Sequence, residues 1–276
     1  MAVLFGTLVN DFLIGTPDSD FIDGSLGDDT LYGSFGDDFI EGGPGNDIIR
    51  GDAVDLFTGA DIEDDGDDDL FGGSGNDLIF GAFGDDYIEG GSGNDLIFGA
   101  FGDDYIDGGS GNDLIFGGSG SDTVFGGSGN DTLDGGDDQD LLRGGSGNDT
   151  LRGGDDIDTL YGGSGSDSLD GGLSRDILYG GQGSDTLTGG PGSDVFVLER
   201  GAGVDIITDF RIDFSFSFGR TTFASDQLKI SRGVTFENLN IFQVGQDTVI
   251  RFGTDTLAVL QGVSASAINS SNFSFI

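Results

Sequence analysis

Apolar residues recur at a fixed interval of nine positions along most of the chain. In residues 72–107 the sequence GGSGNDLIF GAFGDDYIE GGSGNDLIF GAFGDDYID repeats almost unchanged every eighteen residues. Each unit has six positions rich in glycine and acids, followed by three positions whose central residue is aliphatic. The hexamer is typical of a turn, and the triplet fits a short strand whose middle side chain faces the interior. A short fixed period of this kind predicts a solenoid.

The period extends from residue 6 to residue 197, and setting aside one 12-residue insertion leaves 20 units of nine. The eighth position is apolar in every unit, from Leu13 to Phe196. The sixth position is aspartate in every unit: Asp11, Asp20, Asp29, Asp38, Asp47, Asp68, Asp77, Asp86, Asp95, Asp104, Asp113, Asp122, Asp131, Asp140, Asp149, Asp158, Asp167, Asp176, Asp185 and Asp194. Two such columns do not arise by chance, so we predict one regular domain over residues 1–197.

The turn half of each unit supplies oxygen atoms. Glycine adopts positive φ and has no Cβ, so a glycine-rich hexamer can curl with its carbonyl groups pointing inward. The fixed aspartate adds a carboxylate to these carbonyls. A site made of oxygen ligands alone is what Ca²⁺ prefers, with about six to eight ligands. We therefore predict multiple Ca²⁺ ions as cofactors and the position-six aspartates as their side-chain ligands.

The units match the pattern GGxGxDxUx, in which U is a large apolar residue, and so resemble the calcium-binding repeat of the RTX (repeats-in-toxin) family. The resemblance implies an all-β fold: a right-handed parallel β-roll with two nonapeptides per coil and Ca²⁺ between successive turns. It also implies that each ion takes carbonyls of positions one and three from one turn and of positions two and four from the next. In the most regular units these carbonyls belong to Gly72, Gly73, Ser74, Gly75, Gly90, Gly91, Ser92, Gly93, Gly108, Gly109, Ser110, Gly111, Gly126, Gly127, Ser128 and Gly129.

Alternate units form one regular column of turns and one irregular column. Most regular turns read GGSGND, whereas three irregular turns have Asp138, Asp156 or Ser174 in place of the fourth glycine. Aspartate tolerates a left-handed backbone better than most residues, so these turns remain feasible. Arg175 precedes the ligand candidate Asp176 and adds a positive charge there. We expect weaker calcium sites in this part of the irregular column.

Two departures from the repeat leave alternatives open. An insertion near residues 52–63 is either a tolerated surface loop or an additional ion site or partner contact, because acids cluster toward its end. Phe35, Phe83 and Phe101 occupy the outward third position of their turns. Their rings either cover one another or form an apolar strip for docking.

Composition makes the fold conditional on cations. The chain has 276 residues with 51 acids and 10 bases, which gives a formal charge of −41. Without counter-ions the acids repel, so we expect calcium binding to drive folding. The absence of cysteine and histidine excludes disulfides, Cys/His zinc sites and histidine-based triads. Nucleic acid is excluded by the negative charge, and no apolar segment is long enough to insert into a membrane.

From residue 198 the bases become commoner and glycine becomes rarer. Residues 204–210, VDIITDF, predict a last strand of the roll, with Asp205 and Asp209 as candidates for a final ion. Further strands are predicted around residues 214–218, 228–230, 239–242, 248–252 and 256–260. We therefore predict a capping β-domain over residues 198–276. The tail NFSFI resembles the C-terminal signals of type I secretion, and an ordinary edge strand is the alternative.

The leading hypothesis is a secreted, extracellular calcium-binding β-roll with a structural, surface or matrix role. Its expected partners are calcium ions, the type I secretion machinery and a cell-surface or extracellular polysaccharide. We expect no enzyme activity of the chain itself, because the repeats begin at residue 6 and leave no upstream domain.

The alternative is an accessory module of a secreted RTX enzyme or toxin, of the polysaccharide-modifying, protease or haemolysin type. Pore formation would need an apolar or amphipathic membrane segment, and the sequence contains none. Ice binding would need a regular outward rank of Thr or Asn, and the outward positions are mixed.

Overall fold

The computed structural model describes residues 1–52, 66–212, 225–230 and 234–275. These residues form two compact units, Met1–Gly144 and Gly145–Ile276. Nearly all of the expected insertion near residues 52–63 and the strand predicted at residues 214–218 lie outside the described residues.

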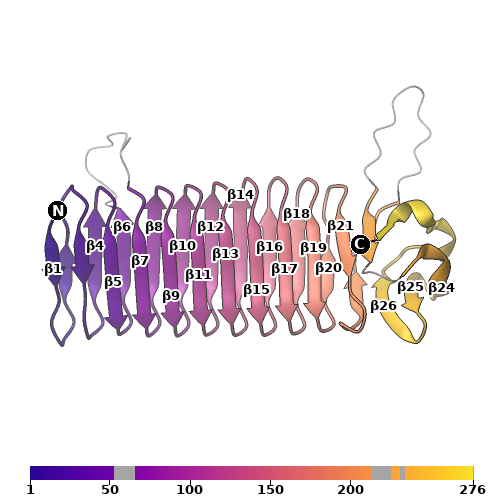
Figure 1. Ribbon diagram of the computed structural model, residues 1–276, viewed down its shortest axis with the longest axis horizontal. Coiled ribbons are helices and arrows are strands. Elements are labelled where there is room, and N and C mark those ends of the chain that lie inside the picture. The colour runs from indigo at the N-terminus through magenta and orange to yellow at the C-terminus, as the bar shows by residue number, and fades with distance from the viewer. Residues whose placement is uncertain (53–65, 213–224, 231–233, 276) are drawn as a thin grey trace, which may run out of the picture. The chain divides into compact units, whose positions relative to one another are not determined.

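In the first unit each nonapeptide ends in a short strand, and successive strands alternate between two parallel sheets (Figure 1). Pairing joins strands two places apart, so that Leu96 pairs with Leu78 on one side and with Leu114 on the other. One sheet contains β1 (Val3–Phe5), β3 (Phe21–Asp23), β5 (Phe39–Pro44), β7 (Asp69–Ser74), β9 (Tyr87–Ser92), β11 (Tyr105–Ser110) and β13 (Thr123–Ser128). The other contains β2 (Phe12–Ile14), β4 (Thr30–Ser34), β6 (Ile48–Asp52), β8 (Leu78–Phe83), β10 (Leu96–Phe101), β12 (Leu114–Ser119) and β14 (Thr132–Asp137).

The second unit begins with the same parallel arrangement and ends in an antiparallel one; β15 (Leu141–Ser146) lies at the boundary of the units. One sheet contains β17 (Thr159–Ser164), β19 (Ile177–Gln182), β21 (Val195–Leu198), β23 (Gln227–Ile230) and β27 (Phe273–Phe275). The other contains β16 (Thr150–Gly154), β18 (Ser168–Gly172), β20 (Thr186–Thr188), β22 (Asp205–Ile207), β26 (Asp255–Leu260), β25 (Asp247–Phe252) and β24 (Leu239–Val244).

In this second sheet β26 pairs in parallel with β22, whereas β24, β25 and β26 pair with each other antiparallel. The helical elements are single 3₁₀ turns: η1 (Phe236–Asn238), η2 (Ala265–Ala267) and η3 (Ser270–Asn272). Among the described residues, no helix has the length and apolar character needed to cross a membrane.

The interior of both units is built from the eighth position of the repeat. From Ile22 to Phe196 every eighth-position side chain is at most 1% exposed, and only the first, Leu13, is half-buried. The flanking seventh and ninth positions point the other way because side chains alternate along a strand. The prediction of an all-β parallel β-roll with two nonapeptides per coil is therefore confirmed.

Aromatic side chains stack along the outside of the first unit. The rings of Phe83 and Phe101 lie 4.8 Å apart between centroids and are nearly parallel, so they cover each other, although Phe101 remains 53% exposed. Phe98 stacks in the same way on Phe80 at 5.0 Å and on Phe116 at 5.1 Å. Such like-on-like pairs favour the register that places equal repeat positions side by side.

The strands predicted after the repeats are present where they are described. The segments at residues 204–210, 228–230, 239–242, 248–252 and 256–260 overlap β22, β23, β24, β25 and β26, respectively. The apolar tail contains the edge strand β27, which pairs with β23. A boundary at residue 198 between roll and cap stays a prediction.

Candidate calcium sites between the turns

Each position-six aspartate lies at the end of a turn, next to the strand that follows it. From Asp20 to Asp194 these residues are at most 4% exposed, while Asp11 in the first turn is half-buried. Burial of so many carboxylates is costly unless each is paired with a positive charge or a set of donors. The partners of the two carboxylate oxygens therefore decide what the sites can bind.

One oxygen of each carboxylate ties successive coils together. Oδ1 of Asp95 accepts a hydrogen bond from the backbone N–H of Asp77 at 2.8 Å, and Asp113 does the same for Asp95 at 2.8 Å. In the other column Oδ1 of Asp104 accepts from the Asp86 amide at 2.9 Å. This bond fixes the orientation of the carboxylate within the turn.

The second oxygen is buried and lacks a hydrogen-bond partner. This holds for Oδ2 of Asp29, Asp38, Asp47, Asp77, Asp95, Asp104, Asp113, Asp122, Asp167, Asp176, Asp185 and Asp194. A buried acceptor left unsatisfied costs about 1–3 kcal/mol, and more when it is charged. Twelve repetitions of the same arrangement indicate a ligand that the turns are built to hold.

Backbone carbonyls face the same spaces. A methyl group added at Gly90 would lie 2.7 Å from Oδ2 of Asp95 and 2.8 Å from the carbonyl oxygen of Gly108 in the next turn. A methyl group at Gly93 would lie 1.4 Å from the carbonyl oxygen of Gly75 in the preceding turn. Carbonyls of positions one and four thus point between successive turns, and a side chain at Gly90 or Gly93 would collide with them.

The third-position carbonyls have an additional partner that the repeat pattern did not predict. The carbonyl oxygens of Ser92, Ser110 and Ser128 accept hydrogen bonds of 2.8 Å from the fourth-position amides of the preceding turns. A carbonyl oxygen has two lone pairs, so this bond leaves one of them for a cation. The role of these carbonyls as ligands stays a prediction.

The donor set fits Ca²⁺. Within the described part of the chain, no group of three or more acidic side chains is arranged to hold a metal ion by itself. An ion between turns must therefore take many of its ligands from carbonyls, and a mixture of carbonyl and carboxylate oxygens is characteristic of calcium sites. A bound Ca²⁺ would supply the positive charge that the buried Oδ2 atoms need.

Burial also changes the protonation of the carboxyl groups in the calcium-free chain. Burial, followed by nearby aspartates, raises the pKa of Asp38, Asp113 and Asp122 to about 7. The pKa of Asp47 and Asp167 rises to about 6 for the same reasons. Burial away from positive charge thus favours the protonated form of these carboxyl groups.

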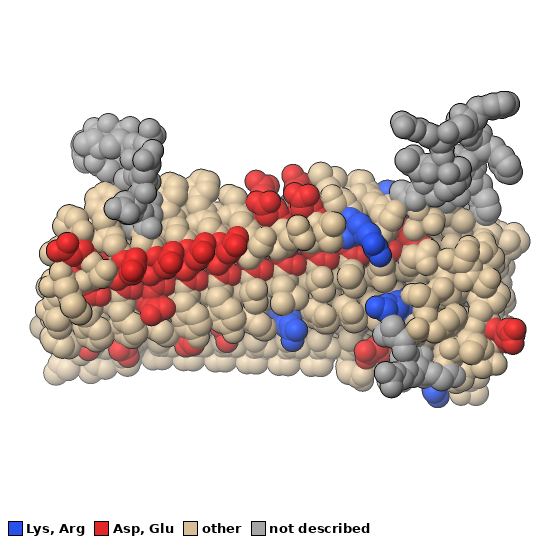
Figure 2. All heavy atoms as spheres, turned by 45° about the horizontal axis from the view of Figure 1, so that its top comes forward, with Lys and Arg blue, Asp and Glu red and all other residues tan. Residues whose placement is uncertain are grey.

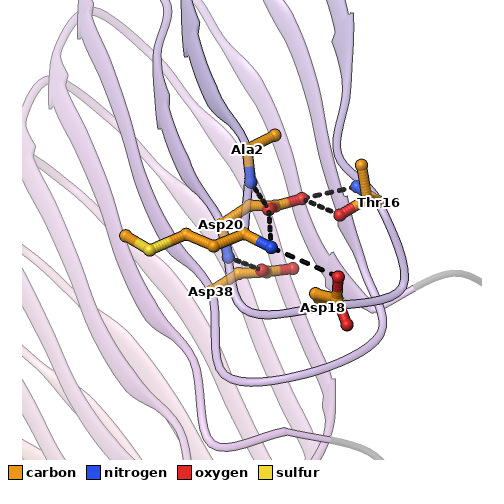
Figure 3. A network of polar contacts seen from close by, with 6 residues as sticks. Ala2, Thr16, Asp18, Asp20 and Asp38 are labelled. Carbon is orange, nitrogen blue, oxygen red and sulfur yellow. Dashed lines mark hydrogen bonds and ion pairs between the residues drawn. The ribbon is translucent and has the colours of Figure 1, made fainter.

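The first two turns satisfy their carboxylates with the protein itself. Oδ2 of Asp20 accepts hydrogen bonds from the backbone N–H and, at 2.9 Å, from the hydroxyl of Thr16 (Figure 3). Oδ2 of Asp11 is held in the same way by Thr7. Burial raises the pKa of Asp20, but the hydrogen bonds from Ala2 and Thr16 outweigh it and lower that pKa overall. These two carboxylates therefore have less need of a cation than those of later turns.

The irregular turns differ in backbone geometry at their fourth position. Asp138, Asp156 and Ser174 have φ of 70°, 65° and 76°, within the left-handed region that aspartate tolerates. Fourth-position glycines such as Gly93 and Gly165 have φ of 135° and 141°. The Ser174 carbonyl nevertheless lies 1.5 Å from a methyl group added at Gly192 in the next turn, as in the regular column, and the weaker sites expected in these turns stay a prediction.

An exposed row of aspartates accompanies the irregular turns. Asp67, Asp85 and Asp103 occupy the fifth position, and Oδ1 of each of the first two accepts a 2.8 Å hydrogen bond from the next aspartate's amide. Figure 2 shows acidic side chains gathered in a row on this face. In the regular column Asn94 accepts the equivalent bond from Asn112 at 2.7 Å. The row adds a negative potential that attracts cations.

Three aspartates after residue 197 accept hydrogen bonds from backbone amides of the last repeat units. Oδ1 of Asp205 accepts from the Asp185 amide at 3.3 Å, and Oδ1 of Asp226 accepts from the Asp194 amide at 3.1 Å. Asp209 instead binds the amides of Gly189 and Gly190 with both its oxygens, so it does not share a site with Asp205. Asp226 was missed by the sequence reasoning because no repeat surrounds it.

Stacked turns with buried carboxylates and inward carbonyls define a calcium-binding parallel β-roll. The family model of the RTX calcium-binding nonapeptide repeat matches the chain in overlapping copies over residues 5–55 and 64–207. The chain therefore belongs to the RTX calcium-binding nonapeptide-repeat family.

A search of curated protein sequences found no match. Among solved structures the chain is similar to the extracellular lipase LipA from Serratia marcescens, with 19% identity and a TM-score of 0.28. The likeness covers 86% of this chain but only 44% of the lipase chain. A likeness this distant does not extend to activity.

Proposed function

We propose that the chain is a secreted calcium-binding β-roll that folds when it binds several Ca²⁺ ions outside the cell. The observation that carries this proposal is the repeated buried Oδ2 atom without a hydrogen-bond partner, facing carbonyls of the next turn. The ligands are the position-six aspartates together with the turn carbonyls. Asp11 and Asp20 contribute least, because threonine and amide groups already satisfy them.

The charge of the chain makes calcium a condition of folding. A formal charge of −41 on 276 residues opposes compaction, and the buried carboxylates add a desolvation cost. Extracellular calcium modules bind with dissociation constants on the order of 10⁻⁴–10⁻³ M, well above the cytosolic concentration of Ca²⁺. The chain would thus stay unfolded before export and fold outside the cell.

The proposed role is structural, at a cell surface or in an extracellular matrix. RTX repeats form a calcium-binding structural module, and this supports a function through shape and surface rather than catalysis. In this proposal residues 1–197 form the roll and residues 198–276 form a β cap whose tail is read by a type I secretion system. An extracellular polysaccharide is the partner class that we propose.

Sedimentation velocity of the full chain tests the conditional fold. In chelator at pH 8 we expect an expanded, slowly sedimenting chain, and in millimolar Ca²⁺ a compact monomer with several bound ions. Equilibrium dialysis counts the ions in the same samples. A chain that is equally compact in chelator and in Ca²⁺ would contradict the proposal.

The second candidate function is an accessory module of a secreted RTX enzyme or toxin, favoured by the same family membership. Assays of the calcium-loaded chain on polysaccharide, peptide and ester substrates separate the two. The structural role predicts binding to polysaccharide without turnover. Turnover that depends on Ca²⁺ would favour the enzymatic alternative.

A further inference from the structure

An open hollow of about 380 Å³ lies in the first unit, on the outer face of neighbouring strands β5, β7 and β9 (Figure 1). It is lined by two phenyl rings, two carboxylates and two glycines: Phe39, Phe71, Glu41, Glu89, Gly73 and Gly91. The four side chains stand at seventh and ninth positions, which point away from the interior of the roll. The candidate calcium sites between the turns therefore do not use these side chains.

The register of the sheet explains the hollow. Phe71 pairs with Glu41 in one neighbouring strand and with Glu89 in the other, so it lies between two glutamates at the ninth position. The centroid of its ring lies 5.1 Å from that of Phe39 and 5.8 Å from that of Tyr87, and both of these residues take the seventh position. The Phe71 ring thus extends toward the seventh positions and leaves space between the two glutamates.

The same combination of ring and acid recurs along this sheet. Five successive strands each present one aromatic residue and one acid outward: Phe21 with Asp23, Phe39 with Glu41, Phe71 with Asp69, Tyr87 with Glu89, and Tyr105 with Asp107. We call these ten residues the aromatic–acid face. Its rings stack from coil to coil, at 5.2 Å between the centroids of Phe21 and Phe39 and at 5.1 Å between those of Tyr87 and Tyr105. A linear ligand along the roll would therefore meet a ring and a carboxylate in every coil.

The first unit has very few bases to balance this face. Arg50 and Arg143 are the only arginine or lysine residues between positions 1 and 144. Arg50 belongs to β6 in the other sheet, where its guanidinium carbon lies 4.5 Å from the ring centroid of Phe80. The guanidinium carbon of Arg143 lies 5.8 Å from the ring centroid of Phe125, in the coils after the aromatic–acid face. Positive charge over the face must therefore come mainly from outside the chain.

The chemistry of the hollow favours a cation carried on a frame with an apolar side. Aromatic rings attract organic cations, and carboxylates accept charge-assisted hydrogen bonds from ammonium groups. The hydroxyl of Tyr87 donates to Oε1 of Glu89, which holds this carboxylate in place. A sugar ring that carries an amino group would place its C–H groups on the rings and its N–H and O–H groups on the carboxylates. Repetition of the pattern in each coil suits a polymer of such sugars.

We propose that the aromatic–acid face binds a linear polysaccharide whose sugars carry free amino groups. Glu41 and Glu89 accept hydrogen bonds from an ammonium group that lies over the Phe71 ring. This inference rests on the proposed function, which names an extracellular polysaccharide as the partner class, and it adds the charge of that polysaccharide and the face that binds it. Calcium contributes indirectly, because the folded roll holds the rings and acids in register.

The test measures binding of a glucosamine hexamer to the calcium-loaded full chain by isothermal titration calorimetry. The N-acetylated hexamer is the neutral match, and at about pH 6 both the sugar amines and the glutamates are charged. The variants are Glu89→Gln, Phe71→Leu and the control Glu237→Gln, whose glutamate is exposed in η1 of the second unit. We expect Glu89→Gln to weaken binding about tenfold and Phe71→Leu about threefold. The control should bind as tightly as the parent chain.

Three results would overturn the inference. The first is binding of the N-acetylated hexamer as tight as that of the glucosamine hexamer. The second is equal weakening by Glu89→Gln and Glu237→Gln, which would show a diffuse attraction to the charge of the chain. The third is equally tight binding of a lysine hexapeptide, which would show that the face takes cations without regard to the sugar.

If a variant does not fold, a crystal structure of the calcium-loaded parent chain with the glucosamine hexamer decides. Sugar density over Phe71 between Glu41 and Glu89 supports the inference, and density elsewhere or none refutes it. Circular dichroism of the same samples reports the calcium-dependent fold separately. A folded chain that binds only the N-acetylated hexamer refutes this inference and leaves the polysaccharide partner in place, whereas a chain that does not fold in Ca²⁺ refutes the proposed function itself.

Discussion

At the residue scale, the position-six aspartate uses its two carboxylate oxygens for different purposes. Oδ1 of Asp104 accepts the Asp86 amide at 2.9 Å, while its Oδ2 is buried without a hydrogen-bond partner. The neighbouring Asp103 is exposed, and its Oδ1 accepts the Ser121 amide at 2.7 Å. The amide oxygen of asparagine can accept either bond, and Asn94 accepts the fifth-position bond in the regular column. A substitution at Asp104 therefore tests the charge at an ion site, whereas one at Asp103 tests the charge of an exposed residue that only accepts a hydrogen bond in the turn.

The first prediction compares Asp104→Asn with Asp103→Asn. Removing the charge of Asp104 should lose about one or two bound ions, because each carboxylate faces a neighbouring turn on either side. The free energy of unfolding in Ca²⁺ should fall by about 2 kcal/mol, against about 0.5 kcal/mol or less for Asp103→Asn. Equilibrium dialysis and denaturant unfolding in Ca²⁺ measure both quantities. Equal effects of the two substitutions would show that Asp104 is not a ligand.

A second prediction concerns two alanines that adopt backbone angles suited to glycine. Ala82 and Ala100 have φ of 99° and 94°, and the next turn of the same column has Gly118 at this position with φ of 128°. A non-glycine residue at positive φ costs roughly 1–2 kcal/mol, while glycine costs roughly 0.5–1 kcal/mol in unfolded-state entropy. Replacing both alanines by glycine should therefore raise the free energy of unfolding in Ca²⁺ by about 1–2 kcal/mol.

The control for this prediction is Ser92→Gly, at a position whose φ is not positive. This substitution should destabilise the calcium-loaded chain by about 0.5–1 kcal/mol. Thermal unfolding of both variants in saturating Ca²⁺ gives the comparison. A double alanine variant that is no more stable than the parent chain would show that the turn does not strain Ala82 and Ala100.

At the scale of the element, the nine-residue period predicts the strands because one apolar position per unit must face the interior. Strands β8, β10 and β12 begin where the sequence LIF begins, and their central isoleucines are fully buried. The period also locates the position-six aspartates. The period cannot predict which carboxylate oxygen accepts a hydrogen bond, because the amide that donates to Oδ1 lies in another coil.

The nine-residue period does not predict elements that depend on contacts between residues far apart in the sequence. Asp226 continues a column from Asp194 across 32 residues, and no motif marks it. A turn at residues 200–208 does carry a signal, since aspartate and isoleucine keep their sixth and eighth positions after a two-residue shift. Threonine in the first two turns, four residues before the aspartate, likewise signals the hydrogen-bonded carboxylates of Asp11 and Asp20.

The third prediction concerns the effect of pH on the buried position-six aspartates in both columns of turns. Burial raises the pKa of Asp77, Asp104 and Asp122 from the ordinary value of 3.8 to about 7 in the calcium-free fold. The folded chain therefore binds these protons more tightly than the unfolded chain does. The resulting stabilisation is complete below the unfolded pKa and is lost as the pH rises through about 7.

Lowering the pH from about 8 to about 5 should thus increase β structure in calcium-free buffer and weaken calcium binding, because protons and Ca²⁺ compete for the same oxygens. Circular dichroism in chelator and calcium titrations at both pH values measure the two effects. Tighter calcium binding at the lower pH would contradict the assignment of the buried carboxylates as ligands.

At the scale of the whole molecule, the balance of 51 acids against 10 bases sets the condition for folding. The buried eighth-position side chains supply one apolar residue per nonapeptide, which is a thin interior for a chain of this charge. Calcium ions between turns would neutralise the carboxylates and contribute folding free energy at the same time. We therefore expect metal binding and folding to form one equilibrium.

The most direct test is far-UV circular dichroism of the full chain at pH 8 during a titration with Ca²⁺, with Mg²⁺ as the control. Mg²⁺ requires a small octahedral site and retains its water, so the carbonyl-rich turns should not hold it. We predict a cooperative change from coil to β structure near millimolar Ca²⁺ and no such change with Mg²⁺ at equal concentration. A complete β spectrum in chelator, or an equal response to Mg²⁺, would contradict it.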